Sequence, residues 1–425
     1  MRCLPPILLL ALTACNSRAA THTTAATRQA PDGSEPAPTA TPMRAAGAAP
    51  RASAAATTGT PALASTGTAR TARQVAPPGI VRALYVNRFA AQRAQRLRGL
   101  LAIADTTEIN AFVVDVKDEF GLDYHSTDPS LVRNEGTMTK IPDLRALLDT
   151  LAAHRILPIA RIVVFKDSVA ARVNPDHVIR KPDGTPWHDK KGLTWVDPYD
   201  HAIWDYNIRV AEEMIANGFG EIQFDYIRFP EPYKSLPPQI FRDAKGVSKA
   251  QALHDFLAAA CARTHARGIR CTADVFGLVT TVRGPLEVGQ QWEQMAPVAD
   301  VLLPMVYPSH YPRGAFGIPS PNADPYRTIT IALDTAHARD DKLGITNPDH
   351  VRPWLQAFSL PHLLPRYDST RLRAEKRAVY DAGYDGWVLW NPGSLYAPFL
   401  GALDRETLSH RRSPGTPTTA TATRR

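Results

Sequence analysis

The segment 221–231, which reads EIQFDYIRFPE, places a carboxylate where a buried strand is expected to end. Apolar, β-favouring residues lie before Asp225, and Pro230 cannot continue a central strand. A carboxylate at the C-terminal end of a parallel strand is in position to act as a nucleophile or as a general base. The structural alternative for this side chain is an ion pair with Arg228, and either Arg228 or Lys117 is expected to keep it ionised.

Polar and aromatic side chains lie at the ends of most of the other expected strands. A parallel barrel would bring these strand ends together at one mouth. Acidic groups there can hydrogen-bond hydroxyl groups, while aromatic rings can stack on the apolar faces of sugars. The combination predicts a carbohydrate site. Its expected substrate-binding residues are Asp115, Lys117, Asp118, Asp167, Arg228, Tyr307, His310, Trp390 and Asn391.

Cleavage of a glycosidic bond usually requires two carboxyl groups, one ionised and one protonated. We expect Asp225 and Asp274 to be this catalytic pair, because they would end neighbouring strands. Asp225 is the expected ionised partner, and Asp274 is the expected acid with a raised pKa, since apolar residues follow it. Three other acids, Asp115, Asp118 and Glu119, stay open as alternatives to Asp274.

Short apolar runs alternate with amphipathic stretches between residues 77 and 403, which predicts repeated strand–helix units. Eight such units favour a TIM (β/α)8 barrel, with a doubly wound sheet as the alternative. The expected strands are Val81–Asn87, Ala111–Val116, Leu157–Phe165, Glu221–Ile227, Arg270–Phe276, Val301–Tyr307, Val351–Phe358 and Gly386–Trp390. The expected helices are Ala90–Ala104, Asp143–His154, Tyr199–Asn217, Lys249–Arg267, Tyr326–Ala338 and Arg371–Ala382.

Residues 1–15 resemble a lipoprotein signal peptide. A short apolar run ends in the sequence LTAC, which is similar to a lipobox and makes Cys15 the expected lipidation site. Residues 16–76 are rich in Ala, Thr and Pro, which predicts a disordered linker, and residues 404–425 predict a disordered basic tail. We therefore expect an extracytoplasmic bacterial lipoprotein, periplasmic or on the cell surface, with a lipid anchor to the membrane.

The net charge of +8 comes from the ends of the chain. Residues 1–76 carry a net +5 and residues 404–425 a net +3, so the expected barrel is formally neutral. A neutral barrel gives no support for nucleic-acid binding. Cys261 and Cys271 lie within the expected barrel, and whether they form a disulfide stays open, because sequence does not give the geometry.

Several other chemistries lack their motifs. The sequence has no HExxH motif, no GxSxG elbow and no glycine-rich phosphate loop after a strand. We therefore expect neither a metal nor another cofactor. Arg161 lies within the third expected strand, where an ion pair inside the barrel is its expected role.

Three stretches resemble a family of "putative glycosyl hydrolases", TIM-barrel proteins long catalogued as a domain of unknown function. They are AFVVDVKD at residues 111–118, IARIVVFKD at 159–167 and the segment 221–231, within which FDYIRFP is the most specific. Shorter matches are WVDP at 195–198, WLQAF at 354–358 and GWVLWN at 386–391. The resemblance covers roughly residues 79–403 and implies a barrel related to glycoside hydrolases.

The residues and the resemblance together predict a glycoside hydrolase that acts on an envelope or extracellular polysaccharide. The alternative is a non-catalytic glycan-binding lipoprotein on the same barrel. The sequence does not specify the sugar, the linkage, the stereochemical outcome or the oligomeric state.

Overall fold

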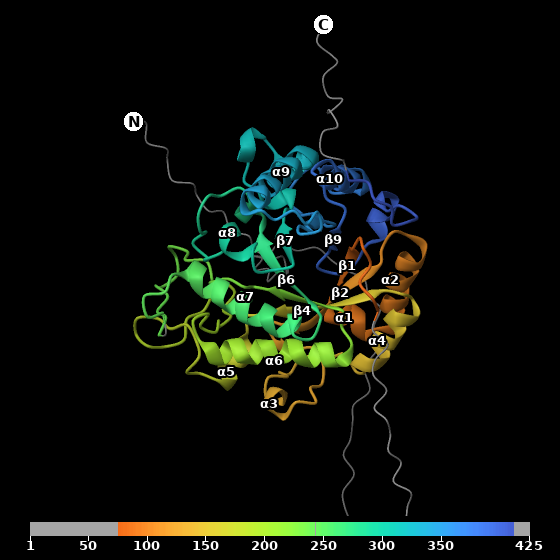
Figure 1. The fold of residues 1–425 in the computed structure, drawn as a ribbon. Coiled ribbons are helices and arrows are strands. Elements are labelled where there is room, and N and C mark those ends of the chain that lie inside the picture. The colour runs from red at the N-terminus through yellow and green to blue at the C-terminus, as the bar shows by residue number, and fades with distance from the viewer. Residues whose placement is uncertain (1–74, 243, 412–425) are drawn as a thin grey trace, which may run out of the picture. The chain divides into compact units, whose positions relative to one another are not determined.

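The computed structural model describes residues 75–242 and 244–411. The predicted signal peptide, the lipidation site Cys15 and nearly all of the predicted linker lie outside these residues, as do residues 412–425. In the described part, β1 pairs with both β2 and β9, which closes a parallel sheet of eight strands into a barrel. This confirms the predicted TIM barrel (Figure 1).

The barrel strands follow the predicted apolar runs closely. Their order around the barrel follows the chain, apart from β3, a short antiparallel strand beside β2. The strands are β1 (Arg82–Val86), β2 (Ala111–Asp118), β3 (Gly121–Leu122), β4 (Leu157–Val163), β5 (Glu221–Asp225), β6 (Arg270–Phe276), β7 (Val301–Met305), β8 (Trp354–Gln356) and β9 (Trp387–Trp390).

The helices surround the strands, with α6 packed against α7 and α9 packed against α10 (Figure 1). Most of the long helices have a polar N-cap residue, because its side-chain oxygen can accept a free backbone N–H. Asp200, for example, accepts from the N–H of Ala202. The predicted first helix is divided in two at Arg93, whose backbone is extended. The α-helices are α1 (Arg88–Gln92), α2 (Ala94–Thr106), α3 (Pro129–Val132), α4 (Leu144–Ala153), α5 (Ser168–Val173), α6 (His201–Asn217), α7 (Lys249–His265), α8 (Trp292–Met295), α9 (Pro325–Leu343) and α10 (Ser369–Asp381).

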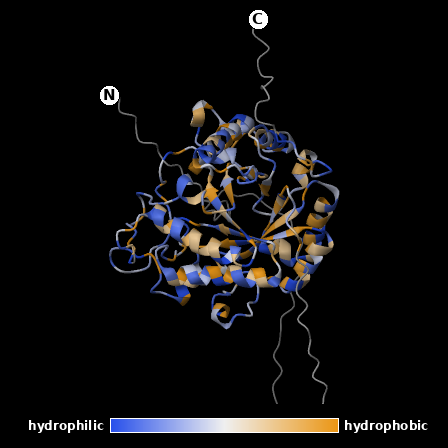
Figure 2. Ribbon diagram, viewed as in Figure 1, coloured by the Kyte–Doolittle hydropathy of each residue, from blue (hydrophilic) through white to orange (hydrophobic). Residues whose placement is uncertain are grey.

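Two apolar layers hold the barrel together. Inward-facing residues such as Val113, Ile159 and Leu303 fill its interior, while outward-facing residues such as Phe224 pack against helix residues such as Phe256. Figure 2 shows hydrophobic strands inside and helices with hydrophilic outer faces. The rigid wall that results fixes the strand ends at which the predicted site lies.

The N-terminal ends of the strands carry a network of buried charges. Arg82 pairs with Glu108, and Arg352 pairs with Glu221 across the barrel floor. The chain beyond residue 404 completes this network: Leu408 O accepts from Arg82 Nη2 at 2.6 Å. Asp385 accepts from the backbone N–H groups of residues 410 and 411. The folded part therefore extends beyond the predicted boundary at 404, because the buried charges need these partners.

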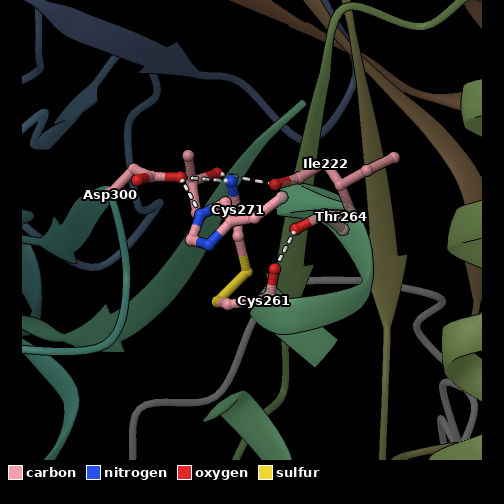
Figure 3. Close-up of a disulfide and its surroundings, with 7 residues drawn as sticks. Ile222, Cys261, Thr264, Cys271 and Asp300 are labelled. Carbon is pink, nitrogen blue, oxygen red and sulfur yellow. Dashed lines mark hydrogen bonds and ion pairs between the residues drawn. A yellow bond between two sulfur atoms is a disulfide. The ribbon is translucent and has the colours of Figure 1, made fainter. Parts of the chain in front are cut away.

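A disulfide joins Cys261 at the C-terminal part of α7 to Cys271 in β6, with their Cα atoms 5.1 Å apart (Figure 3). Next to it, the backbone N–H of Cys271 donates to Asp300 at 2.7 Å. The bond ties a helix to the strand that carries Asp274. This resolves the question that the sequence left open.

Candidate active site

The centre of the barrel mouth is an arginine held by three aspartates. Arg161 of β4 donates from Nη1 to Asp115 at 2.6 Å and from Nε to Asp225 at 3.0 Å. Its Nη2 also donates to Asp225, and Nε lies 3.9 Å from an oxygen of Asp274. The four side chains come from the adjacent strands β2, β4, β5 and β6. The predicted role of Arg161, an ion pair inside the barrel, is therefore observed, and the pair belongs to the site.

Asp225 ends β5 with both carboxylate oxygens occupied. Oδ2 accepts from Arg161, and Oδ1 accepts from the backbone N–H of Tyr226 at 2.5 Å. Tyr226 has a φ of 52°, a left-handed conformation that is costly for a residue other than glycine. Acceptance of several N–H donors is the geometry of an ionised carboxylate. The strained turn after the strand thus helps to hold Asp225 in place.

Asp274 lies deeper than Asp225. Its oxygens accept from Gln223 Nε2 at 2.9 and 3.0 Å and from Trp354 Nε1 at 2.7 Å, and its side chain has no exposed surface. Burial, and then the charge of Asp225, raise the pKa of Asp274 well above its ordinary value. The structure therefore gives Asp274 the predicted raised pKa but does not bring it to the surface of the mouth.

Aromatic rings line one side of this charge cluster. The Tyr85 hydroxyl donates to Asp115, and the Tyr85 ring lies 4.1 Å from that of Trp390, centroid to centroid. Trp354 packs edge-on against both rings, and Arg161 lies over the faces of Tyr85 and Trp390. Burial raises the pKa of Asp115, while Arg161 opposes that shift. The predicted Trp390 therefore lies at the site, partly exposed.

A second aromatic group lies at the end of β7. Tyr307, His310 and Phe358 contact one another edge to face, with centroids 5.3–5.7 Å apart. Burial lowers the pKa of His310 to about 4, so this ring is neutral near pH 7. Both predicted residues of this group thus lie at the mouth, and His310 is partly exposed.

Two predicted substrate-binding residues face away from the mouth. Lys117 and Asp167 pair with each other at 2.9 Å, and both side chains are fully buried. A bulge in β2 causes this: Asp115 lies opposite Arg161, but Lys117 lies opposite Ile162, whose side chain belongs to the outer core. The extra residue turns Lys117 outward, so it does not approach Asp225.

Two further predicted residues form hydrogen bonds within the loops instead of facing the mouth. Arg228 donates to Glu231 at 3.1 Å rather than to Asp225, and its guanidinium lies over the Tyr226 ring. Asn391 donates to Ala357 O and accepts from two backbone N–H groups of its own turn. Both side chains are buried, and their bonds position the loops after β5 and β9.

Tyr85, Gln223 and Trp354 are not among the predicted site residues, although all three contact the predicted acids. Their signal is weak, because none of them lies at the C-terminal end of its strand. Within the described ranges, no group of three or more His, Cys, Asp or Glu side chains is arranged to hold a metal ion. No helix in those ranges is both long and apolar enough to cross a membrane.

A closed parallel barrel of eight strands, with acidic and aromatic side chains near their C-terminal ends, defines the protein as a TIM barrel. The family model for the "Putative glycosyl hydrolase domain" matches residues 83–396, and the chain belongs to this family. The resemblance seen in the sequence is thereby confirmed.

Solved structures that are similar to the chain include the following two. A hypothetical protein from Ruminiclostridium thermocellum ATCC 27405 is 35% identical, with a TM-score of 0.38 over 42% of this chain and 90% of that chain. The PgaB (BpsB) glycoside hydrolase domain from Bordetella bronchiseptica is 16% identical, with a TM-score of 0.53 over 76% and 97% of the two chains, and shares the fold. No curated protein matches the chain.

Proposed function

We propose that the protein hydrolyses a glycan polymer at the barrel mouth, with Asp225 as the ionised carboxylate. Asp225 would attack the anomeric carbon or activate a water molecule. The observation that carries the proposal is the fixation of Asp225 at the end of β5. Arg161 holds one oxygen and the Tyr226 N–H holds the other, so the carboxylate is oriented before substrate arrives.

The proton donor is proposed to be Asp274, in keeping with the sequence. Its raised pKa keeps a proton available, and Arg161 lies near both members of the pair. Its burial requires that Gln223 or Trp354 release it when substrate binds, since an acid must reach the leaving oxygen. Asp118 is the alternative donor: its side chain is 13% exposed, and burial followed by the charge of Glu119 raises its pKa to about 7.

The test compares Asp225→Asn, Asp274→Asn and Asp118→Asn on two kinds of substrate. A polysaccharide needs acid assistance for its leaving group, whereas a dinitrophenyl glycoside of the same sugar needs almost none. Asp225→Asn should lose both activities by orders of magnitude in protein that is still folded, because Asp115 continues to pair with Arg161. The variant of the true acid should lose the polysaccharide activity and keep the aryl glycoside activity. Full polysaccharide turnover by Asp225→Asn would contradict the proposal.

The location is proposed to be extracytoplasmic, with the chain anchored through a lipid on Cys15. The disulfide between Cys261 and Cys271 supports an oxidising compartment, because cytosolic thiols are usually kept reduced. The lipobox-like sequence before Cys15 supports the anchor. Envelope or extracellular polysaccharides would then be the accessible substrates.

The burial of Asp274 favours a second candidate, a glycan-binding lipoprotein without turnover. In that case the barrel would bind polymers through its aromatic rings and carboxylates alone. An assay for new reducing ends separates the two candidates: binding without their release supports the lectin-like function.

A further inference from the structure

The β1–β2 side of the mouth carries an aromatic pair that the proposed chemistry does not use. Phe89 is the second residue of α1, directly after β1, and Phe120 lies in the turn between β2 and β3. The Arg88 guanidinium lies 4.8 Å from the Phe89 ring centroid and 5.6 Å from that of Phe120. Loops that follow the strands of such a barrel lie on its catalytic face. The pair therefore belongs to the same face as Asp225.

The Phe89 side chain is exposed, although the helix that carries it is held in place by hydrogen bonds. Nearly half of the residue, 47%, is exposed. Asn87 caps the start of α1 by accepting from Ala90 N, and it donates to Pro392 O in the loop after β9 at 2.8 Å. An exposed ring on a short, anchored helix has little conformational freedom to lose when a ligand covers it.

The polar groups beside the rings have bonding capacity left. Arg88 Nη1 donates to Asp118 at 2.5 Å and to Asp123 at 3.1 Å. Among the described residues, however, Arg88 Nε and Asp123 Oδ2 are buried without a hydrogen-bond partner. Most buried polar groups of folded proteins have one, so the ion pairs of this cluster leave two polar atoms unsatisfied. The Asp118 side chain next to it is 13% exposed and can bond a hydroxyl group.

We propose that Phe89, with Phe120 and Asp118, forms a subsite that binds a pyranose ring of the polymer beside the ring that is cleaved. The apolar face of the sugar stacks on the exposed Phe89 ring, and one hydroxyl bonds to Asp118. Arg88 orients both rings and Asp118. The inference rests on the proposed function, because it assigns a part of the same substrate to this side of the mouth.

The test measures binding rather than turnover, in full-length chains that all carry Asp225→Asn. Titration calorimetry would use hexasaccharides of β-1,4-linked glucose, N-acetylglucosamine and xylose, and then the monosaccharide of the sugar that binds. Phe89→Ala should weaken hexasaccharide binding about tenfold, the equivalent of about 1.4 kcal/mol, and leave monosaccharide binding nearly unchanged. Phe89→Trp should restore the affinity.

The matched control is Leu400→Ala, which removes an exposed side chain (41%) from the short helix η5 (Ala397–Ala402) that packs against α10. This variant should bind both sugars like the parent. Equal hexasaccharide affinity of the Phe89→Ala variant and the parent would overturn the subsite alone. A parent that binds none of these sugars, nor the polysaccharides from which they derive, would overturn the proposed function as well.

Discussion

Arg161 and Asp225 meet through a single carboxylate oxygen, to which both Nε and Nη2 of the guanidinium donate. The second oxygen accepts only from the Tyr226 N–H among the described residues. Arg161 also donates from Nη1 to Asp115, so one cation neutralises two buried carboxylates of the site, Asp115 and Asp225. The desolvation of these charges is tolerable only while the cation is present.

Replacing Arg161 with Met should therefore destabilise the barrel as well as inactivate it. The variant leaves Asp115 and Asp225 unpaired, which should lower the free energy of unfolding by about 3–5 kcal/mol. The control is Arg263→Met in α7, where an exposed arginine pairs with Glu212 and a loss below about 1 kcal/mol is expected. Urea unfolding at pH 7 measures both. Equal losses in the two variants would show that Arg161 does not hold buried charges.

The pH dependence of stability should report on Asp118. Burial and then the nearby charge of Glu119 raise its pKa to about 7, above the value near 4 in the unfolded chain. The folded state therefore holds the proton more tightly, and its contribution is complete below pH 4 and is lost as the pH rises toward 7. Each unit of difference between the two pKa values corresponds to about 1.4 kcal/mol.

Asp118→Asn should flatten this part of the pH–stability curve, and Glu119→Gln should shift its end to lower pH. Unfolding free energies measured between pH 4 and 8 for the parent and both variants would check this. A curve for Asp118→Asn that matches the parent would assign the slope to other groups, such as Asp274, whose pKa is also raised.

The sequence predicts the barrel well because its strands are short apolar runs with charged residues mainly near their ends. It does not predict the bulge in β2, which decides the face of the strand on which a side chain lies. Strict alternation would place Asp115 and Lys117 on one face, but the register shift between them turns Lys117 to the outside. A bulge depends on pairing with the neighbouring strand, which the local sequence does not encode. The partner of Arg228 is also not set by spacing, since Asp225 and Glu231 are both three residues away in sequence, and in the fold Arg228 pairs with Glu231.

The C-terminal segment 404–411 should be part of the folding unit. A chain that ends at Leu403 loses the bonds from this segment to Arg82, Asp385 and Lys376. The free energy of unfolding should fall by roughly 2–5 kcal/mol, because buried charged groups lose their partners. A chain that ends at Arg411 is the control and should melt like the full-length protein. Equal melting temperatures of the two truncated chains would show that the segment adds no stability.

Cys15→Ala should release the protein from membranes without a change in its fold. The residue lies outside the described part of the chain, and the expectation comes from the lipobox-like LTAC sequence. Without the lipid anchor, the variant should appear in the soluble fraction, and its circular dichroism spectrum should match that of the parent. Fractionation of cells that carry the parent or the variant measures this. A variant that stays in the membrane pellet would contradict lipidation at Cys15.

The disulfide should make stability depend on redox conditions. Cys261 and Cys271 are ten residues apart in sequence, so closing this loop is expected to contribute roughly 2–3 kcal/mol. Dithiothreitol should lower the melting temperature of the parent and leave that of the Cys261→Ala/Cys271→Ala variant unchanged. Dithiothreitol should likewise lower the melting temperature of protein that has been exported to an oxidising compartment. It should not change that of protein made in the cytoplasm without residues 1–15, because thiols stay reduced there. Free thiols in the exported protein, counted under denaturing conditions, would contradict both the bond and the proposed location.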